Sequence, residues 1–329
     1  MSEFEKFMPF ESRIDMKDLQ EKIETAKAEI KKVIVGQDKL LDFLFISVLS
    51  GGHSLIEGVP GVAKTVTAKI LAKTIDASFS RIQFTPDLMP SDVTGTSILD
   101  LRTNEFEFVK GPIFANIILI DEINRAPAKT QASLFECMSE KQITADGVTH
   151  VLDQPFLVFA TQNPIEHEGT YRLPEAQLDR FLFKIDVSYP SLESEVEILK
   201  EQQARKNADK EKSVNTVIHK DDLIRFQALI KEVFVHEQII QYIAQIVHQT
   251  RNNTNLTLGA SPRASLALLD ASKALAAMNG RDFVTPEDVK YIAFPVIGHR
   301  VILTPEREME GFNTKQIIQQ IIDTVEIPR

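Results

Sequence analysis

The sequence has a single cysteine, Cys137, so no disulfide can form within the chain. It also lacks an apolar stretch long enough to cross a bilayer, because its most apolar run, residues 40–49, is short and contains Asp42. The N-terminal residues MSEFEKFMPFESR do not show the basic segment and apolar segment of a secretory signal. These absences predict a soluble, cytoplasmic protein that does not insert into a membrane.

An excess of positive charge is missing as well. Lysine and arginine number 37, and aspartate and glutamate number 47, which gives a formal net charge of −10. This charge disfavours a protein whose whole surface binds nucleic acid, although it is compatible with a local basic patch. Of the 329 residues, 43% are hydrophobic and 26% are charged, which excludes wholesale disorder and suggests two domains.

Short apolar runs alternate with segments of helical pattern in the first part of the chain. The runs cover residues 53–57, 79–84, 117–121, 156–161 and 181–187. Short buried strands that alternate with helices are typical of a parallel sheet covered on both faces. Helices predicted over 15–33 and 39–50 precede the first run. After Pro190 the strand pattern stops, so we expect an α/β part followed by an all-α part.

This pattern divides the chain into three parts. Residues 1–190 carry the N-terminal helices and the α/β part, 191–215 a helix and polar linker, and 216–329 a helical domain. Residues 86–114 predict an inserted hairpin or helix-hairpin, and Asp146-Gly147 predicts the turn of a second hairpin. Helix N-caps in the last part are predicted at Ser261, Thr285 and Asn313.

A glycine-containing loop follows the first predicted strand and precedes a helix. Glycines allow backbone N–H groups to converge on an anion, and the N-terminus of the next helix adds its positive dipole end. Lys64 would reach the β- and γ-phosphates of a nucleotide, and the Thr65 hydroxyl would bind Mg²⁺. Ala63 stands where glycine is usual, and we expect that position to be helical or nearly so. The residues predicted to contact the nucleotide here are Gly58, Val59, Pro60, Gly61, Val62, Ala63, Lys64, Thr65 and Val66.

Two further strand ends carry polar side chains that suit nucleotide chemistry. A run of four isoleucine or leucine residues ends in Asp121, which would hold Mg²⁺ through water, and Glu122, which would polarise an attacking water. Asn163 follows a later strand and could orient that water without adding negative charge. Ordinary turn formation by the Asn-Pro pair is the alternative interpretation of Asn163.

Two arginines lie away from these strand ends. Arg180 is expected at a corner between a short helix and a strand, where it could face a neighbouring subunit. The alternative is a surface arginine paired with Asp179 or Glu175. Arg263 lies in the first turn of a predicted helix, where a cation opposes the helix dipole and a bound phosphate would remove the conflict. A merely solvated arginine there would cost only about 0.3–1 kcal/mol.

The segments GVPGVAKT, IILIDEINRAP, ATQNP, LPEAQLDRF and GASPRA together resemble the MoxR family of AAA+ ATPases, over nearly the whole chain from about Val35. The resemblance implies a P-loop NTPase fold: a three-layer αβα core with a parallel sheet in the order 5-1-4-3-2, and a helical lid. The insertion between Pro86 and Phe114 resembles the extra hairpin of a clade shared with magnesium chelatase and replicative helicases. Val35, Gly36 and Gln37 resemble the segment that packs near the adenine.

The resemblance also implies roles for single residues. By position, Lys64 and Thr65 match Walker A, Asp121 and Glu122 match Walker B, Asn163 matches sensor 1, Arg180 the arginine finger and Arg263 sensor 2. Members of the family bind ATP or ADP with Mg²⁺ at the subunit interfaces of a homo-oligomeric ring, here expected as a hexamer. MoxR relatives act as chaperones that mature or insert metal cofactors, usually with partners that contain a von Willebrand factor A domain.

The leading functional hypothesis is therefore an ATP hydrolase that converts loss of the γ-phosphate into motion between core and lid and so remodels a client protein. A nucleotide-gated binding module without turnover would need neither Glu122 nor Arg180. A DNA-dependent motor is disfavoured by the charge of −10 and by the lack of a basic aromatic cluster on the insertion. The ATPase subunit of a magnesium-chelatase-like complex remains an open alternative, and the sequence does not identify the client.

Overall fold

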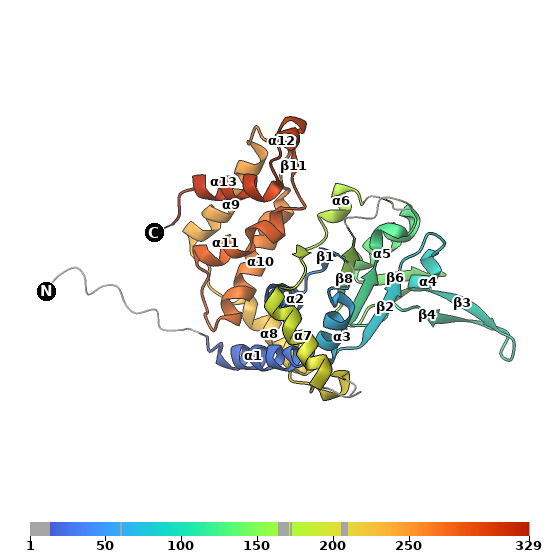
Figure 1. Cartoon of the computed structure of the whole chain (residues 1–329). Coiled ribbons are helices and arrows are strands. Elements are labelled where there is room, and N and C mark those ends of the chain that lie inside the picture. Colours follow the sequence, from blue (N-terminus) through green and yellow to red (C-terminus); the bar gives the residue numbers. More distant parts are fainter. Residues whose placement is uncertain (1–13, 60, 164–170, 172, 205–209, 329) are drawn as a thin grey trace.

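The computed structural model describes residues 14–59, 61–163, 171, 173–204 and 210–328. An α/β part lies beside a helical part, and a long hairpin projects from the α/β part away from the helices (Figure 1). None of the described helices is long and apolar enough to cross a membrane.

A five-stranded parallel sheet forms the centre of the α/β part. Its strands lie in the order β2 (Phe79–Gln83), β5 (Ile117–Asp121), β8 (Leu157–Gln162), β1 (Ser54–Gly58) and β9 (Phe183–Val187). If these five are counted along the chain, the order from the other edge is 5-1-4-3-2, which confirms the predicted topology. β5 is apolar up to its last residue because helices cover both of its faces.

Helices cover the two faces of the sheet in separate layers. On one face, Leu119 belongs to a hydrophobic cluster with α2 (Asp38–Ser50) and α3 (Lys64–Thr74). On the other face, Ile118 and Ile120 pack with apolar residues of α5 (Ala128–Glu140). Successive side chains of a strand point to opposite faces, so β5 supplies both layers. The three-layer αβα core is confirmed.

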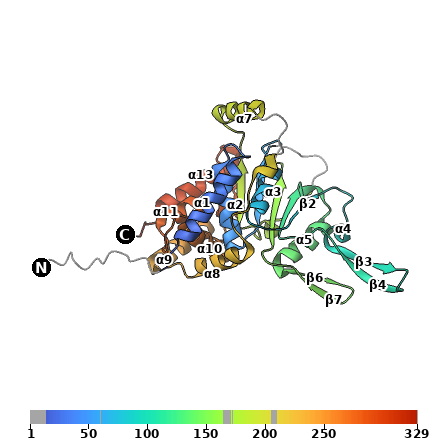
Figure 2. The same cartoon turned by 90° about the horizontal axis from the view of Figure 1, so that it is seen from below.

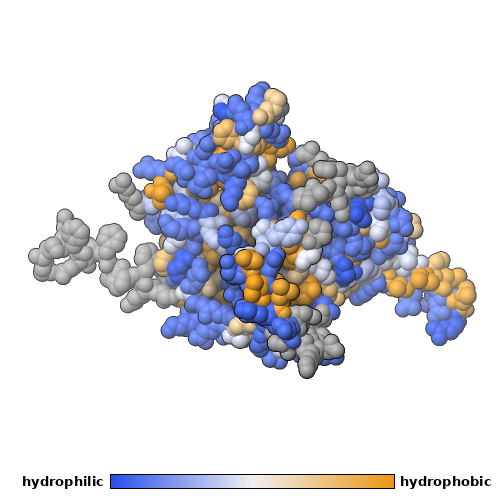
Figure 3. Space-filling view, in the orientation of Figure 1, coloured by the Kyte–Doolittle hydropathy of each residue, from blue (hydrophilic) through white to orange (hydrophobic). Residues whose placement is uncertain are grey.

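Two antiparallel hairpins extend from the core on the same side (Figure 2). The insertion forms α4 (Pro90–Thr94), β3 (Gly95–Asp100) and β4 (Glu105–Lys110), which is the helix-hairpin, one of the two forms predicted. The second hairpin, β6 (Gln142–Ala145) and β7 (Val148–Val151), turns at Asp146-Gly147 as predicted. The rings of Phe108 and His150 stack with centroids 4.2 Å apart and join the two hairpins. Apolar side chains gather on the longer hairpin (Figure 3), where Leu101 is 86% exposed and Phe106 75%.

The rest of the chain is mostly helical. Its helices are α7 (Leu192–Ala204), α8 (Lys220–Lys231), α9 (Glu237–Arg251), α10 (Pro262–Met278), α11 (Pro286–Ile297), α12 (Pro305–Met309) and α13 (Thr314–Thr324). Ser261, Thr285 and Asn313 are their N-caps where predicted. The prediction that strands stop after Pro190 is wrong, because β10 (Leu256–Leu258) and β11 (Ile302–Leu303) form an antiparallel pair. These strands are too short to show a period-two pattern.

The N-terminal helix α1 (Lys17–Lys31) packs against the helical part (Figures 1 and 2). Its buried stripe of Leu19, Ile23, Ala26 and Ile30 belongs to the same hydrophobic cluster as residues of α8, α10 and α11. Polar contacts reinforce this packing: Lys22 pairs with Asp222 at 2.7 Å, and the Ile14 N–H donates to Asp282 Oδ2 at 3.1 Å. Helix α1 and the helical part therefore share one core, which continues onto one face of the sheet.

Candidate functional site

The phosphate loop lies between β1 and α3, at the edge of the sheet where the parallel strands end. Gly58 ends β1, Gly61 has a φ of 84°, and α3 begins at Lys64. The Lys64 Nζ donates to the Gly58 carbonyl oxygen at 2.6 Å, so the lysine folds back over the loop. Burial lowers the pKa of its ammonium, and the carboxylates of Asp121 and Glu122 partly oppose this effect. Pro60, which is also predicted to contact the nucleotide, lies outside the described residues.

Ala63 does not have the near-helical conformation expected from the sequence. Its φ of 59° and ψ of 20° place it in the left-handed region, directly before α3. Its carbonyl oxygen accepts hydrogen bonds from both the N–H and the hydroxyl of Thr67, at 2.9 Å each. The left-handed conformation costs an L residue about 1–2 kcal/mol, a cost that glycine avoids. The expectation was wrong because this loop turns left-handed to enter the helix, which explains why glycine is usual here.

Asp121 is the last residue of β5, and its buried carboxylate forms an ion pair with an arginine. Arg81 on β2 donates from Nε to Asp121 Oδ2 at 2.6 Å, and the Thr161 hydroxyl donates to Oδ1 at 3.2 Å. The sequence analysis did not identify Arg81 or Thr161. Arg81 and Gln83 lie two residues apart on β2, so both side chains point to the same face of this edge strand. That polar spacing was the signal in the sequence that could have marked them as partners of the acidic residues.

Glu122 has a left-handed backbone, with a φ of 57°, which turns its side chain out of the strand. Its Oε2 accepts from Gln83 Nε2 at 2.8 Å and pairs with Arg125 Nε at 3.1 Å. Its N–H donates to the hydroxyl of Thr161 at 3.1 Å. Thr161 thus connects both acidic residues, and Gln83 holds the carboxylate that is predicted to polarise water.

The residues at this edge fit a magnesium ion. Asp121 and Thr65 offer a carboxylate and a hydroxyl oxygen, the kind of donor that Mg²⁺ prefers. The Arg81 guanidinium at Asp121 shows that this carboxylate can accept positive charge in its present position. Within the described part of the chain, no group of three or more His, Cys, Asp or Glu could hold a metal alone. A magnesium ion bound by one carboxylate, nucleotide phosphates and water needs no such group.

Asn163 and the turn of Val35, Gly36 and Gln37 complete this edge of the sheet. Asn163 is half-buried and directly follows β8, whose Gln162 lies opposite Glu57 of β1. Gly36, with a φ of 71°, packs so closely on α7 that a Cβ there would lie 3.2 Å from Ser194 Oγ. Since α7 follows the end of β9, this turn also lies near the loop. The structure thus gathers every predicted site residue that it describes here, except two.

Arg180 lies at the opposite ends of the strands from the phosphate loop, where the parallel strands begin. It follows α6 (Glu175–Leu178) and precedes β9, and the neighbouring Leu182 N–H donates to the His53 carbonyl at 2.7 Å, before β1 begins. The five residues of β1, at about 3.3 Å each, separate this end from the phosphate loop by roughly 16 Å. The Arg180 Nη1 donates to the Phe135 carbonyl oxygen at 3.2 Å. Arg180 therefore does not reach the phosphate loop of its own chain.

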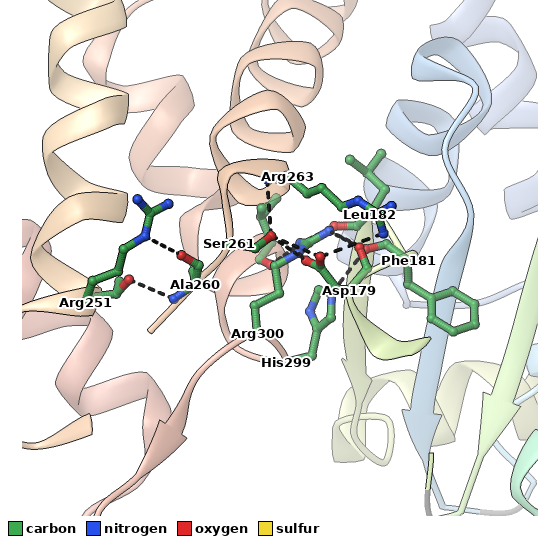
Figure 4. A network of polar contacts seen from close by, with 11 residues as sticks. Asp179, Phe181, Leu182, Arg251, Ala260, Ser261, Arg263, His299 and Arg300 are labelled. Atoms are coloured by element: carbon green, nitrogen blue, oxygen red, sulfur yellow. Dashed lines mark hydrogen bonds and ion pairs between the residues drawn. The ribbon is translucent and has the colours of Figure 1, made fainter. Parts of the chain in front are cut away.

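Arg263 lies beside Arg180, and the two side chains line one cavity of about 410 Å³. The Arg263 side chain is more than half exposed, and its Nη1 is 3.9 Å from Asp179 Oδ2 (Figure 4). Asp179 receives its short hydrogen bonds from Ser261 and Arg300. Both predicted arginines are thus brought together, on a surface far from the phosphate loop of the same chain.

Known proteins share these features. Residues 53–183 match the ATPase family associated with various cellular activities (AAA), and residues 248–321 match the AAA lid domain. Over 316 residues the chain is 44% identical to chaperone MoxR1 of Mycobacterium tuberculosis, which covers 93% of this chain and 82% of that protein. The chain belongs to the MoxR family of AAA+ ATPases. This MoxR protein is accordingly an ATP hydrolase.

Two other relatives match this chain over nearly its full length. The uncharacterized protein YeaC of Bacillus subtilis is 45% identical over 311 residues, which cover 94% of this chain and 96% of YeaC. The crystal structure of a candidate ATPase from Cytophaga hutchinsonii is 45% identical and has a TM-score of 0.88, with 95% of this chain and 97% of that chain covered. The arrangement of core and helical domain is therefore shared with an experimental structure.

Arg81→Ala is expected to strengthen Mg²⁺ binding at Asp121, because the guanidinium and the metal compete for one carboxylate. The Arg81 side chain is half exposed, and such ion pairs are worth about 1 kcal/mol or less, so the gain should not exceed about fivefold. The measurement is the Mg²⁺ concentration that gives half-maximal tightening of ATP binding. Arg102→Ala, on the projecting hairpin, is the control. An unchanged Mg²⁺ requirement in Arg81→Ala would contradict the competition.

Proposed function

We propose that this MoxR protein hydrolyses ATP between neighbouring subunits of a homo-oligomeric ring, expected as a hexamer, and uses the cycle to remodel or mature client proteins. The observation that supports this proposal is the location of Arg180 and Arg263 at the sheet edge opposite the phosphate loop. A head-to-tail interface brings two different surfaces of one chain together, and such interfaces close into rings. The arginine surface of one subunit would then face the phosphate loop of the next.

Each site residue at the carboxyl ends of the strands, beside the phosphate loop, has a separate role in this proposal. Lys64 holds the β- and γ-phosphates, Glu122 accepts hydrogen bonds from the attacking water and polarises it, and Asn163 fixes the orientation of that water. Thr65 and Asp121 would hold Mg²⁺, which when bound neutralises charge on the phosphates. Arg180 from the neighbouring subunit stabilises the charge that develops as the γ-phosphoryl group leaves.

Arg263 is assigned in this proposal to the nucleotide of the neighbouring subunit and not to that of its own chain. It shares its cavity with Arg180, and it occupies the first turn of α10, where a cation opposes the helix dipole. A phosphate that enters this cavity from the next subunit would compensate both charges. The same anion would thus bind the core arginine and the lid arginine together.

The projecting hairpin supports a protein client over DNA. Its exposed end combines apolar Leu101 and Phe106 with acidic Glu105 and Glu107, which outnumber the exposed Arg102, and this excess of negative charge disfavours a phosphate backbone. The relative named as a chaperone agrees with a protein client. We further propose maturation or metal-cofactor insertion as the task, together with a partner that contains a von Willebrand factor A domain.

The hydrolysis rate per subunit is expected to rise steeply as the protein is concentrated, because an isolated subunit lacks the arginines of a neighbour. The rate should be measured over a dilution series in saturating Mg²⁺ and ATP, with the mass of the assembly determined in parallel. Half-maximal activity should coincide with half-maximal assembly. A monomer that retains the full rate per subunit would contradict hydrolysis between subunits.

A further inference from the structure

Residues of the helical domain form hydrogen bonds with the chain on both sides of Arg180. Arg300, which follows α11, has only 3% of its side chain exposed. Its Nε donates to Asp179 Oδ1 at 2.8 Å, and its Nη2 donates to the carbonyl oxygens of Asp179 at 3.2 Å and Phe181 at 2.6 Å (Figure 4). Its Nη1 donates to the carbonyl oxygen of Leu182 at 3.3 Å. One buried guanidinium thus holds the residue before Arg180 and the two residues after it.

Two further residues of the helical domain bind the same segment. The Ser261 hydroxyl, at the N-cap of α10, contacts both Asp179 carboxylate oxygens, at 3.1 and 2.9 Å. His299 Nε2 lies 3.1 Å from the Phe181 carbonyl oxygen (Figure 4). Burial, with a smaller effect of Arg300, lowers the pKa of His299 well below its usual value, so the neutral ring donates this bond. The contacts come from two separate places in the domain, which fixes the orientation of the segment as well as its position.

These contacts are strong because separating Arg300 from residues 179–182 is costly. A buried guanidinium must keep its charge paired and its N–H groups bonded, because an uncompensated buried charge strongly destabilises a protein. Residues 179–182 therefore cannot move away from the helical domain unless Arg300 is exposed to water or loses its partners. Arg180 lies inside this segment, with its guanidinium directed to the Phe135 carbonyl oxygen.

We propose that Arg300 is the positioning residue for Arg180, so that the helical domain sets the geometry of the arginine presented to the neighbouring ATP site. This inference rests on the proposed function, in which Arg180 acts across the subunit interface. A change in the orientation of the helical domain then moves Arg180 and Arg263 together, relative to the neighbour's phosphates. The helical domain of one subunit thereby controls hydrolysis in the next.

Arg300→Lys tests the proposal, because lysine keeps the charge but cannot span several acceptors as the guanidinium fork does. ATP affinity should stay within about twofold, and kcat should fall by roughly 10²-fold, the effect of misplacing a catalytic group by about 1 Å. Arg281→Lys is the matched control, because Arg281 pairs with Asp288 and bonds to the Phe283 carbonyl inside the helical domain. It should hydrolyse ATP at the wild-type rate.

Mixed rings separate positioning from a general loss of structure. When Arg300→Lys is mixed with Glu122→Gln, the ATP held by an Arg300→Lys subunit can receive a correctly held Arg180 from a Glu122→Gln neighbour. Hydrolysis should recover as it does in a mixture of Arg180→Ala and Glu122→Gln. The double variant Arg180→Ala/Arg300→Lys should be no slower than Arg180→Ala, because Arg300 acts through Arg180 alone. Asp179→Asn keeps the shape and an acceptor oxygen for Arg300 but removes its paired charge, so where it folds it should show the same pattern.

The possible outcomes test the two proposals separately. If the Arg180→Ala and Glu122→Gln mixture fails to recover despite demonstrated subunit exchange, the proposed hydrolysis between subunits is wrong. If that mixture recovers and those of Arg300→Lys and Asp179→Asn with Glu122→Gln do not, the positioning role is wrong. A double variant much slower than Arg180→Ala would likewise overturn it. Should Arg300→Lys fail to fold, as judged by thermal unfolding, Arg300→Gln decides the matter, because it leaves no unpaired cation buried against residues 179–182 and keeps only part of their hydrogen bonds.

Discussion

Arg180→Ala is expected to bind ATP with near wild-type affinity and to hydrolyse it about 10³–10⁵-fold more slowly, the range by which arginine fingers accelerate phosphoryl transfer. Binding should persist because Arg180 lies at the far edge of the sheet from the phosphate loop of its own chain. Hydrolysis should fail because the departing γ-phosphoryl group loses the guanidinium of the neighbour. Nucleotide titration and steady-state release of phosphate measure the two effects separately.

Mixing shows whether the arginine acts on its own subunit or on the next. Arg180→Ala and Glu122→Gln are each nearly inactive, and random equal mixing makes roughly a quarter of the interfaces in a head-to-tail ring fully wild type. Those interfaces pair an intact Glu122 with an intact Arg180 from the neighbour. Activity of the mixture should therefore approach a quarter of the wild-type rate. An arginine that acts on its own chain would give no recovery.

Lys64→Ala and Glu122→Gln are expected to fail at different steps. Lys64→Ala should abolish measurable ATP binding, because the phosphates lose the cation of the loop. Glu122→Gln should bind ATP almost normally but hydrolyse it about 10²–10⁴-fold more slowly, because only polarisation of the water is lost. Nucleotide titration should show a binding defect in the first variant alone. Lys69→Ala, an exposed lysine of the same helix α3, is the control.

Equal loss of ATP binding in both variants would contradict these separate roles. If the roles hold, Glu122→Gln also provides a subunit that stays loaded with ATP. Clients that associate with the ATP state should accumulate on it, and they should be absent from Lys64→Ala prepared in the same way. This comparison addresses the identity of the client, which the sequence does not reveal.

The part of the site beside the phosphate loop was predictable because it depends on local sequence. Strand, glycine loop and helix follow one another around Lys64, and the acids after a buried strand define Asp121 and Glu122. The ends of parallel strands meet at one edge, so their proximity followed from the fold class. Ala63 was mispredicted because the sequence does not show that the chain must turn left-handed there.

The partners of these residues could not be predicted in the same way. Arg81 reaches Asp121, and Gln83 reaches Glu122, only because β2 pairs with β5 in one particular register. The contact of Arg300 with Asp179 joins residues 121 positions apart and depends on how the helical domain packs on the core. Such contacts are set by tertiary packing, which leaves no short-range pattern in the sequence.

The shared core of α1 and the helical domain also constrains how the protein is made. The helix α10, which helps to bury the apolar stripe of α1, begins roughly 230 residues after α1 ends, and ribosomes add about 5–20 residues per second. For some tens of seconds the nascent chain therefore carries an apolar helix whose final covering does not yet exist. During that interval Leu19, Ile23 and Ile30 are open to non-native contacts. The burial of α1 is thus completed only when the last third of the chain has been synthesised.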